Sequence, residues 1–105
     1  MRTRALQTLR HTVYRLAPDL LLVFKPRGHR EGEHAHAQRQ RLRVLRGELV
    51  VRTRRRRVRL TSRSRPLLLP AGSVHETVAV KHTWLIAESL DSPVLQAGAA
   101  RSAAK

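Results

Sequence analysis

The chain has 105 residues, of which 22 are Lys or Arg and 7 are Asp or Glu, so its formal net charge is +15. This length allows one domain with one core, and a hydrophobic content of 41% excludes a wholly disordered chain in spite of the charge. The absence of cysteine excludes disulfides, thiolate zinc sites and cysteine nucleophiles, and no apolar run approaches the roughly 18 residues that span a bilayer.

The two ends of the chain differ in composition from its middle. Residues 1–10 are basic and lack the apolar segment of a secretory signal, so we expect a basic N-terminal arm. Residues 97–105 contain nothing large to bury, which predicts a disordered tail. The folded domain is therefore expected to occupy residues 11–96. We expect a cytoplasmic protein that has no membrane partner.

Short runs with the β-strand pattern fill this window, and turn residues separate them. The expected strands are 12–16, 20–25, 39–45, 48–53, 57–60, 67–69, 76–80 and 84–88. Strands this short and this closely spaced are typical of a closed barrel or a sandwich. The sequence therefore predicts an all-β fold.

The arginines follow the strand pattern. In residues 39–44 three arginines alternate with Gln40, Leu42 and Val44, so we expect the arginines to face solvent and the other three to face the interior. The arginine run 54–57 falls where a hairpin must turn. An Arg-rich surface attracts polyanions through its field. The chain has only one Phe, one Tyr and one Trp for base stacking, so nucleic acid is the least favoured partner.

Three histidines and one glutamine form the most informative pattern. Along one strand His34, His36 and Gln40 would leave the same face, and His75 follows the turn at 70–72. An isolated His-x-His pair is also consistent with two surface histidines. Three imidazoles and an amide oxygen on neighbouring strands would make a metal site with open positions for water or substrate.

The spacing of these residues resembles the two motifs of the cupin family. The first motif, G-x5-H-x-H-x3,4-E-x6-G, is matched by Gly28, His34, His36, Gln40 and Gly47, with Gln in place of Glu. The second motif, G-x5-P-x-G-x2-H-x3-N, is matched by Ser64, Pro70, Gly72, His75 and Ala79, with its Gly and Asn replaced. The resemblance covers residues 28–79.

The resemblance implies a double-stranded β-helix, or jelly roll, that pairs as a homodimer. It also implies one divalent ion (Fe, Mn, Ni, Zn or Cu) at the positions of His34, His36, Gln40 and His75. A neutral Gln leaves the full charge on the ion, which favours an anionic small molecule. Glu31 and Glu33 precede these residues and are expected to be solvated loop carboxylates, although either could reach the site as a base.

Two classes of function remain open. The first is a metal-dependent enzyme of the dioxygenase or isomerase/lyase type, acting on a small oxygen-rich substrate. Isomerase or lyase chemistry needs a proton shuttle, and no residue of the sequence stands out as one. The second is a non-catalytic cupin that binds or senses a small ligand. Fold alone does not choose between them.

Overall fold

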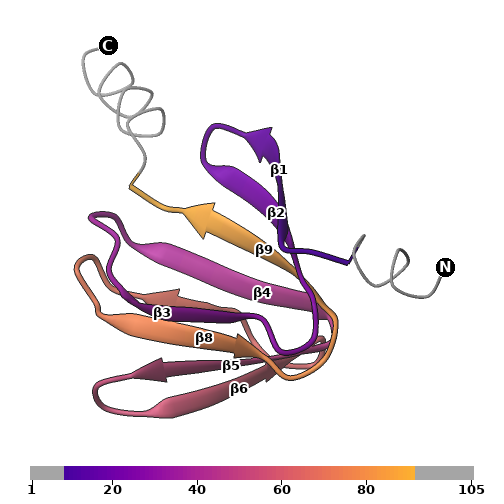
Figure 1. Cartoon of the computed structure of the whole chain (residues 1–105). Helices are drawn as coiled ribbons and strands as arrows, with labels where there is room; N and C mark the ends of the chain where they lie inside the picture. The colour runs from indigo at the N-terminus through magenta and orange to yellow at the C-terminus, as the bar shows by residue number, and fades with distance from the viewer. Residues whose placement is uncertain (1–8, 92–105) are drawn as a thin grey trace, which may run out of the picture.

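The computed structural model describes residues 9–91, and in this range the chain forms nine β-strands (Figure 1). They are β1 (Thr12–Ala17), β2 (Leu20–Lys25), β3 (Arg30–His34), β4 (Gln40–Arg46), β5 (Glu48–Thr53), β6 (Arg57–Thr61), β7 (Leu67–Leu69), β8 (His75–Ala79) and β9 (Thr83–Ser89). Eight of them lie within one residue of the expected strands, and β3 is additional. The expected C-terminal tail and most of the N-terminal arm lie outside the described residues. The same range holds no helix long and apolar enough to cross a membrane.

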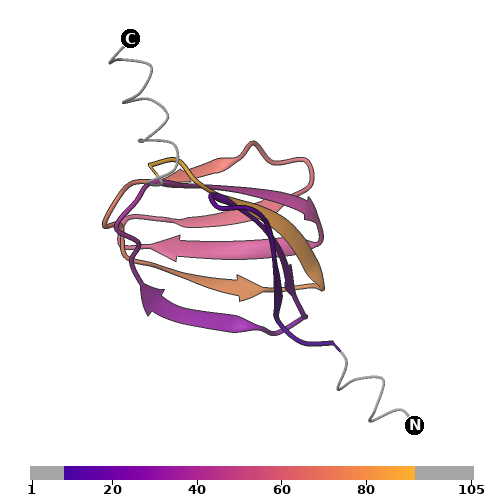
Figure 2. The ribbon, with the colours of Figure 1, turned by 90° about the horizontal axis from the view of Figure 1, so that it is seen from above.

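The strands pair antiparallel in two sheets. One sheet has the order β1-β2-β9-β4-β7 and the other β3-β8-β5-β6. Figure 2 shows β3, β8 and β5 side by side, with β1, β2 and β9 across them at one side. The chain passes from one sheet to the other between β4 and β5, where Gly47 makes the crossover. This arrangement confirms the expected all-β jelly roll.

Both sheets contribute their inward faces to a single core. The buried apolar residues are Val23, Leu42, Val44, Leu49, Val51, Leu60, Leu67, Leu69, Ala79 and Leu85. Burying one such Leu or Val side chain contributes roughly 1.5–3 kcal/mol. The alternation expected in β4 is confirmed, because Leu42 and Val44 are buried whereas Arg41 and Arg43 are exposed. The arginine run 54–57 is exposed at the turn between β5 and β6, as expected.

Outward-facing arginines pair with acids, on neighbouring strands in three cases and between the residues that flank β4 and β9 in the fourth. The pairs are Arg39–Asp91, Arg41–Glu88, Arg52–Glu76 and Arg59–Glu48. Exposed pairs of this kind add little stability. These four ion pairs nevertheless use four of the seven acids of the chain to neutralise arginines. The hairpin turn at 54–57 forms none of the ion pairs found in residues 9–91.

Asp91 is expected to titrate below the ordinary range of an aspartate. A hydrogen bond from the Arg39 guanidinium, 2.7 Å from Nε to Oδ2, lowers the pKa of Asp91 more than its surroundings raise it. A depressed pKa means that the pair stabilises the fold above the unfolded pKa and stops doing so as the pH falls through the folded pKa. A carbon NMR titration should give Asp91 a lower midpoint in the wild type than in Arg39→Gln. Equal midpoints would contradict the assignment.

Candidate metal centre

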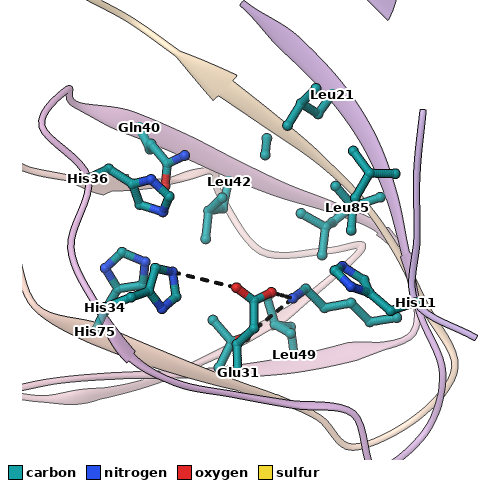
Figure 3. Close-up of a pocket in the computed structure, with 15 residues that line it drawn as sticks. His11, Leu21, Glu31, His34, His36, Gln40, Leu42, Leu49, His75 and Leu85 are labelled. Carbon is teal, nitrogen blue, oxygen red and sulfur yellow. Dashed lines mark hydrogen bonds and ion pairs between the residues drawn. The ribbon is translucent and has the colours of Figure 1, made fainter. Parts of the chain in front are cut away.

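Three histidines converge at one end of the jelly roll (Figure 3). His34, His36 and His75 each place one ring nitrogen within 4.8 Å of the others, and their ring centroids are 4.3–5.4 Å apart. His34 ends β3 and His75 begins β8, and the two residues are paired directly across the sheet. His36 lies in the loop 35–39 that leads to β4. This cluster could hold a metal ion.

Backbone carbonyls orient two of these rings. His34 Nδ1 lies 2.8 Å from the carbonyl oxygen of Gly32, and His75 Nδ1 lies 3.0 Å from that of Ser73. A carbonyl oxygen only accepts hydrogen bonds, so each Nδ1 must carry the proton and donate it. Each neutral ring then keeps its lone pair on Nε2. Histidines that bind metals in proteins are commonly fixed in this way.

The environment favours the uncharged forms of His36 and His75. Burial lowers the pKa of His36, and the nearby rings of His34 and His75 lower it further. Burial also lowers the pKa of His75, partly offset by the hydrogen bond to Ser73. A metal ion binds the deprotonated imidazole, so these shifts reduce competition from protons near neutral pH. The donor set therefore fits a divalent ion.

Gln40, the fourth expected ligand, begins β4 and lines the same cavity as the three histidines. In Figure 3 its side-chain amide points toward His36. An amide oxygen is a neutral ligand that carries no charge to the site. The assignment of Gln40 as a ligand stays a prediction.

The expectation that one strand presents His34, His36 and Gln40 was wrong. β3 and β4 belong to different sheets, and the loop between them carries His36. The loop is fixed in place because the carbonyl oxygen of His36 accepts a hydrogen bond from the amide of Gly72, at 2.8 Å. This bond joins the loop to the turn before His75. His34, His36 and Gln40 come together because the loop 35–39 crosses from one sheet to the other, and not because they alternate along one strand.

A cavity of about 190 Å³ opens beside the cluster. Its wall is mostly apolar and its polar lining residues are His11, Lys25, Glu31, His34, His36, Gln40, His75 and Thr77. Pockets for drug-sized ligands occupy roughly 300–1,000 Å³. This cavity therefore suits a molecule of only a few heavy atoms.

No family model and no curated protein matches the sequence. Solved structures, in contrast, match its fold. A Cupin 2 conserved barrel domain protein from Salinispora arenicola aligns with a TM-score of 0.72 and 20% identity, over 89% of this chain and 86% of that one. A cupin superfamily protein from Desulfitobacterium hafniense aligns with a TM-score of 0.65 and 16% identity, over 78% and 77%. The chain has the cupin fold.

An enzyme shares the cupin fold with this chain. DMSP lyase DddQ from Ruegeria pomeroyi aligns with a TM-score of 0.66 and 21% identity, over 80% of this chain and 49% of the lyase. These structural matches confirm the resemblance that the two sequence motifs indicated. The three histidines of the cluster are residues that match the two sequence motifs.

An ion pair inside the cupin cavity was not expected from the sequence. The Lys25 ammonium contacts Glu31 Oε1, and Thr77 Oγ1 lies 3.5 Å from the same nitrogen. Glu31 Oε2 lies 3.6 Å from His34 Nε2. Burial raises the pKa of Glu31, but the hydrogen bond and charge of Lys25 outweigh it and hold this pKa below its ordinary range. Both Glu31 and Glu33 lie in β3 rather than in the loop that we expected. Glu31 is paired with Lys25 and its side chain is 39% exposed, whereas Glu33 is exposed and forms none of the ion pairs in the part of the chain that the structure describes.

A second group of donors is less buried than the histidine cluster. His11, His29 and Glu31 offer ligand atoms within 4.8 Å of one another, and the two imidazoles stack with centroids 4.3 Å apart. Burial and then the charge of Lys25 lower the pKa of both histidines. The ammonium of Lys25 is already in contact with Glu31, so a positive charge occupies this group. We assign no metal ion to it.

Proposed function

We propose that this cupin binds one divalent metal ion through His34, His36, His75 and Gln40 and acts as a metal-dependent enzyme on a small, oxygen-rich anion. The observation that carries the proposal is the convergence of three imidazoles, two of them oriented by backbone carbonyls, on the wall of an internal cavity. Three nitrogens and one oxygen suit Fe, Mn, Ni, Zn or Cu. Such an ion, when bound, supplies Lewis-acid or redox chemistry.

The charges that line the cavity support an anionic substrate. The four proposed ligands are neutral in their metal-binding forms, and Lys25 and Glu31 offset each other. The lining thus has no net charge, so a divalent ion would give the cavity a net positive charge even with the Glu31 carboxylate beside it, and an anion would offset that charge. Apolar residues such as Leu42, Leu49 and Leu85 line the cavity and limit the water in it, which strengthens the attraction.

The residues that line the cavity favour an isomerase or lyase reaction over a dioxygenase reaction. A redox-neutral reaction needs groups that accept and donate a proton near the substrate. Lys25 and Glu31 bring an ammonium and a carboxylate into the cavity, and of these the sequence had indicated only Glu31, as one of two candidate bases. A lyase is among the enzymes with the same fold. We therefore propose a lyase or isomerase as the first activity to test.

The test combines metal analysis with turnover. The protein is purified after growth in medium supplemented with Fe, Mn, Ni, Zn and Cu, and its metal content is measured by mass spectrometry. We expect about one ion per chain. Small carboxylates that fit a cavity of about 190 Å³ are then assayed for conversion, and small diketones and thiols for oxygen consumption. Metal at background level would overturn both the proposed function and the ligand assignment.

A non-catalytic sensor is the alternative, because Lys25 already engages the one carboxylate that faces the cavity among the described residues. A sensor would gain thermal stability from a small anion without converting it. If the sensor recognised the anion without the metal, the His34→Ala variant would bind the anion as tightly as the wild type. Turnover by the metal-loaded wild type would exclude the sensor.

We also propose that the cupin is a homodimer that pairs through the outer face of its five-stranded sheet. The edge strand β1 belongs to this sheet, and Tyr14 and Leu68 are 47% and 60% exposed. The Tyr14 ring stacks on Trp84 with centroids 6.2 Å apart. A surface of this kind with an unpaired edge suits pairing with a second copy.

Light scattering after size exclusion should give twice the mass of one chain for the wild type. Tyr14→Lys is expected to shift the protein toward the monomer, because it places a charge in the paired face. Val80→Lys is the matched control, since Val80 is 40% exposed and lines the outer face of the other sheet. A wild type that runs as a monomer would contradict the proposal.

A further inference from the structure

The ligand set of this site lacks a negative charge. Gln40 stands where the cupin motif has Glu, and the three histidines are neutral when they bind a metal. Among the described residues that line the cavity, Glu31 is the one carboxylate. It comes from β3, three residues before His34, and lies outside the motif positions.

A bulge turns Glu31 toward the histidines. In a regular strand, residues three apart point to opposite faces. The pairing of β3 with β8 shifts register between Glu31 and His34, so both side chains reach the cavity. Glu31 Oε2 then lies 3.6 Å from His34 Nε2, the nitrogen that the Gly32 hydrogen bond leaves with its lone pair.

Lys25 restrains the other oxygen of this carboxylate. Lys25 lies on β2 in the opposite sheet, and its side chain is only 6% exposed. Its ammonium contacts Glu31 Oε1, so the pair joins the two sheets across the cavity. An ion pair with one buried partner is weak evidence for a stabilising role, because removing a charge from water offsets much of what its attraction to the other charge returns. The position of this pair, in contrast, places a carboxylate at the edge of the metal site.

We propose that Glu31 supplies the negative charge that Gln40 does not, and that Lys25 holds the carboxylate beside the histidines where it lowers the energy of a bound cation. This inference rests on the proposed metal site. The opposing interpretation is that Glu31 serves only to neutralise Lys25. The two interpretations differ in what they expect for metal affinity.

The metal affinity of the apo protein distinguishes the two interpretations of Glu31. After removal of metal with EDTA, Zn²⁺ is titrated into the wild type and variants by calorimetry, and thermal melting of each apo protein checks its fold. Glu31→Gln is expected to weaken Zn²⁺ binding about 10- to 100-fold, as for partners just outside a ligand set. Glu33→Gln removes the same charge two residues away on an exposed side chain and is expected to change the affinity less than about twofold.

The double variant Lys25→Met/Glu31→Gln is the decisive measurement. It removes both charges, so the formal charge of the cavity equals that of the wild type and no ammonium is left unpaired. If Glu31 acts on the metal, this variant still binds Zn²⁺ at least about tenfold more weakly than the wild type. Wild-type affinity in a folded double variant would overturn the inference while leaving the metal site intact. A wild type that binds no Zn²⁺ would instead overturn the proposed function.

Discussion

His34→Ala is expected to abolish stoichiometric metal binding and, with it, any metal-dependent turnover. The variant removes one of three converging nitrogens and the hydrogen bond from Nδ1 to Gly32 that orients it. The loss of affinity should exceed the roughly 10- to 100-fold that removal of an outer partner costs. Metal content after purification and Zn²⁺ titration of the apo protein both measure it.

The same variant should keep its fold. The His34 side chain is 30% exposed and ends its strand, so alanine leaves only a small void in the interior. Its matched control is His82→Ala, another histidine near a strand end, which lies outside the cluster. We expect His82→Ala to bind metal as the wild type does. A His34→Ala protein that retains one ion per chain would show that the cluster is not the metal site.

The strands could be predicted because buried apolar residues alternate with exposed polar residues along them. In β4, buried Leu42 and Val44 alternate with exposed arginines, and the sequence pattern gave the correct face for each. β3 was missed because its residues 30–34 are mostly charged and because a bulge interrupts its pairing with β8. Its pairing with β8 is a tertiary contact, and periodicity along the chain does not show such contacts.

The histidine cluster was predictable from motif spacing, whereas the acid and base beside it were not. Lys25 lies in an apolar run, Leu20–Lys25, that hides which residues face inward. Counting by twos from buried Val23 would have directed Lys25 to the interior. Glu31 gave no such signal, because strand alternation from His34 directs it outward and only the bulge reverses that direction.

Gly47→Ala is expected to have the largest effect on stability. Gly47 has φ of 98°, a conformation that costs an L-residue roughly 1–2 kcal/mol. A Cβ at this position would also lie 2.2 Å from the carbonyl oxygen of His82 and 2.8 Å from the Cα of Thr83. These are backbone atoms next to buried Thr83, so relief of the overlap requires the β4–β5 crossover to move. Overpacking of this kind costs about 1–3 kcal/mol in addition.

Variants of two other glycines separate the cost of a positive φ from the cost of the close contact with His82. Gly28 has φ of 87° but open space around a Cβ, and Gly32 has open space without a positive φ. Urea unfolding should rank the variants, with Gly32→Ala near the wild type, Gly28→Ala less stable by about 1–2 kcal/mol, and Gly47→Ala by about 3 kcal/mol or more. Equal losses for Gly28→Ala and Gly47→Ala would show that the close approach to His82 is unimportant.

The metal affinity of folded Gly47→Ala should nevertheless match the wild type. Gln40 begins β4 and Gly47 follows its last residue, roughly 23 Å away at the rise of a strand. A change at the crossover therefore lowers the folded fraction without touching the histidines. His34→Ala is expected to do the reverse, keeping the melting temperature of the apo wild type and losing the metal. Zn²⁺ titration at a temperature where both variants are folded measures this difference, and a parallel loss of affinity in Gly47→Ala would show that the crossover and the site are coupled.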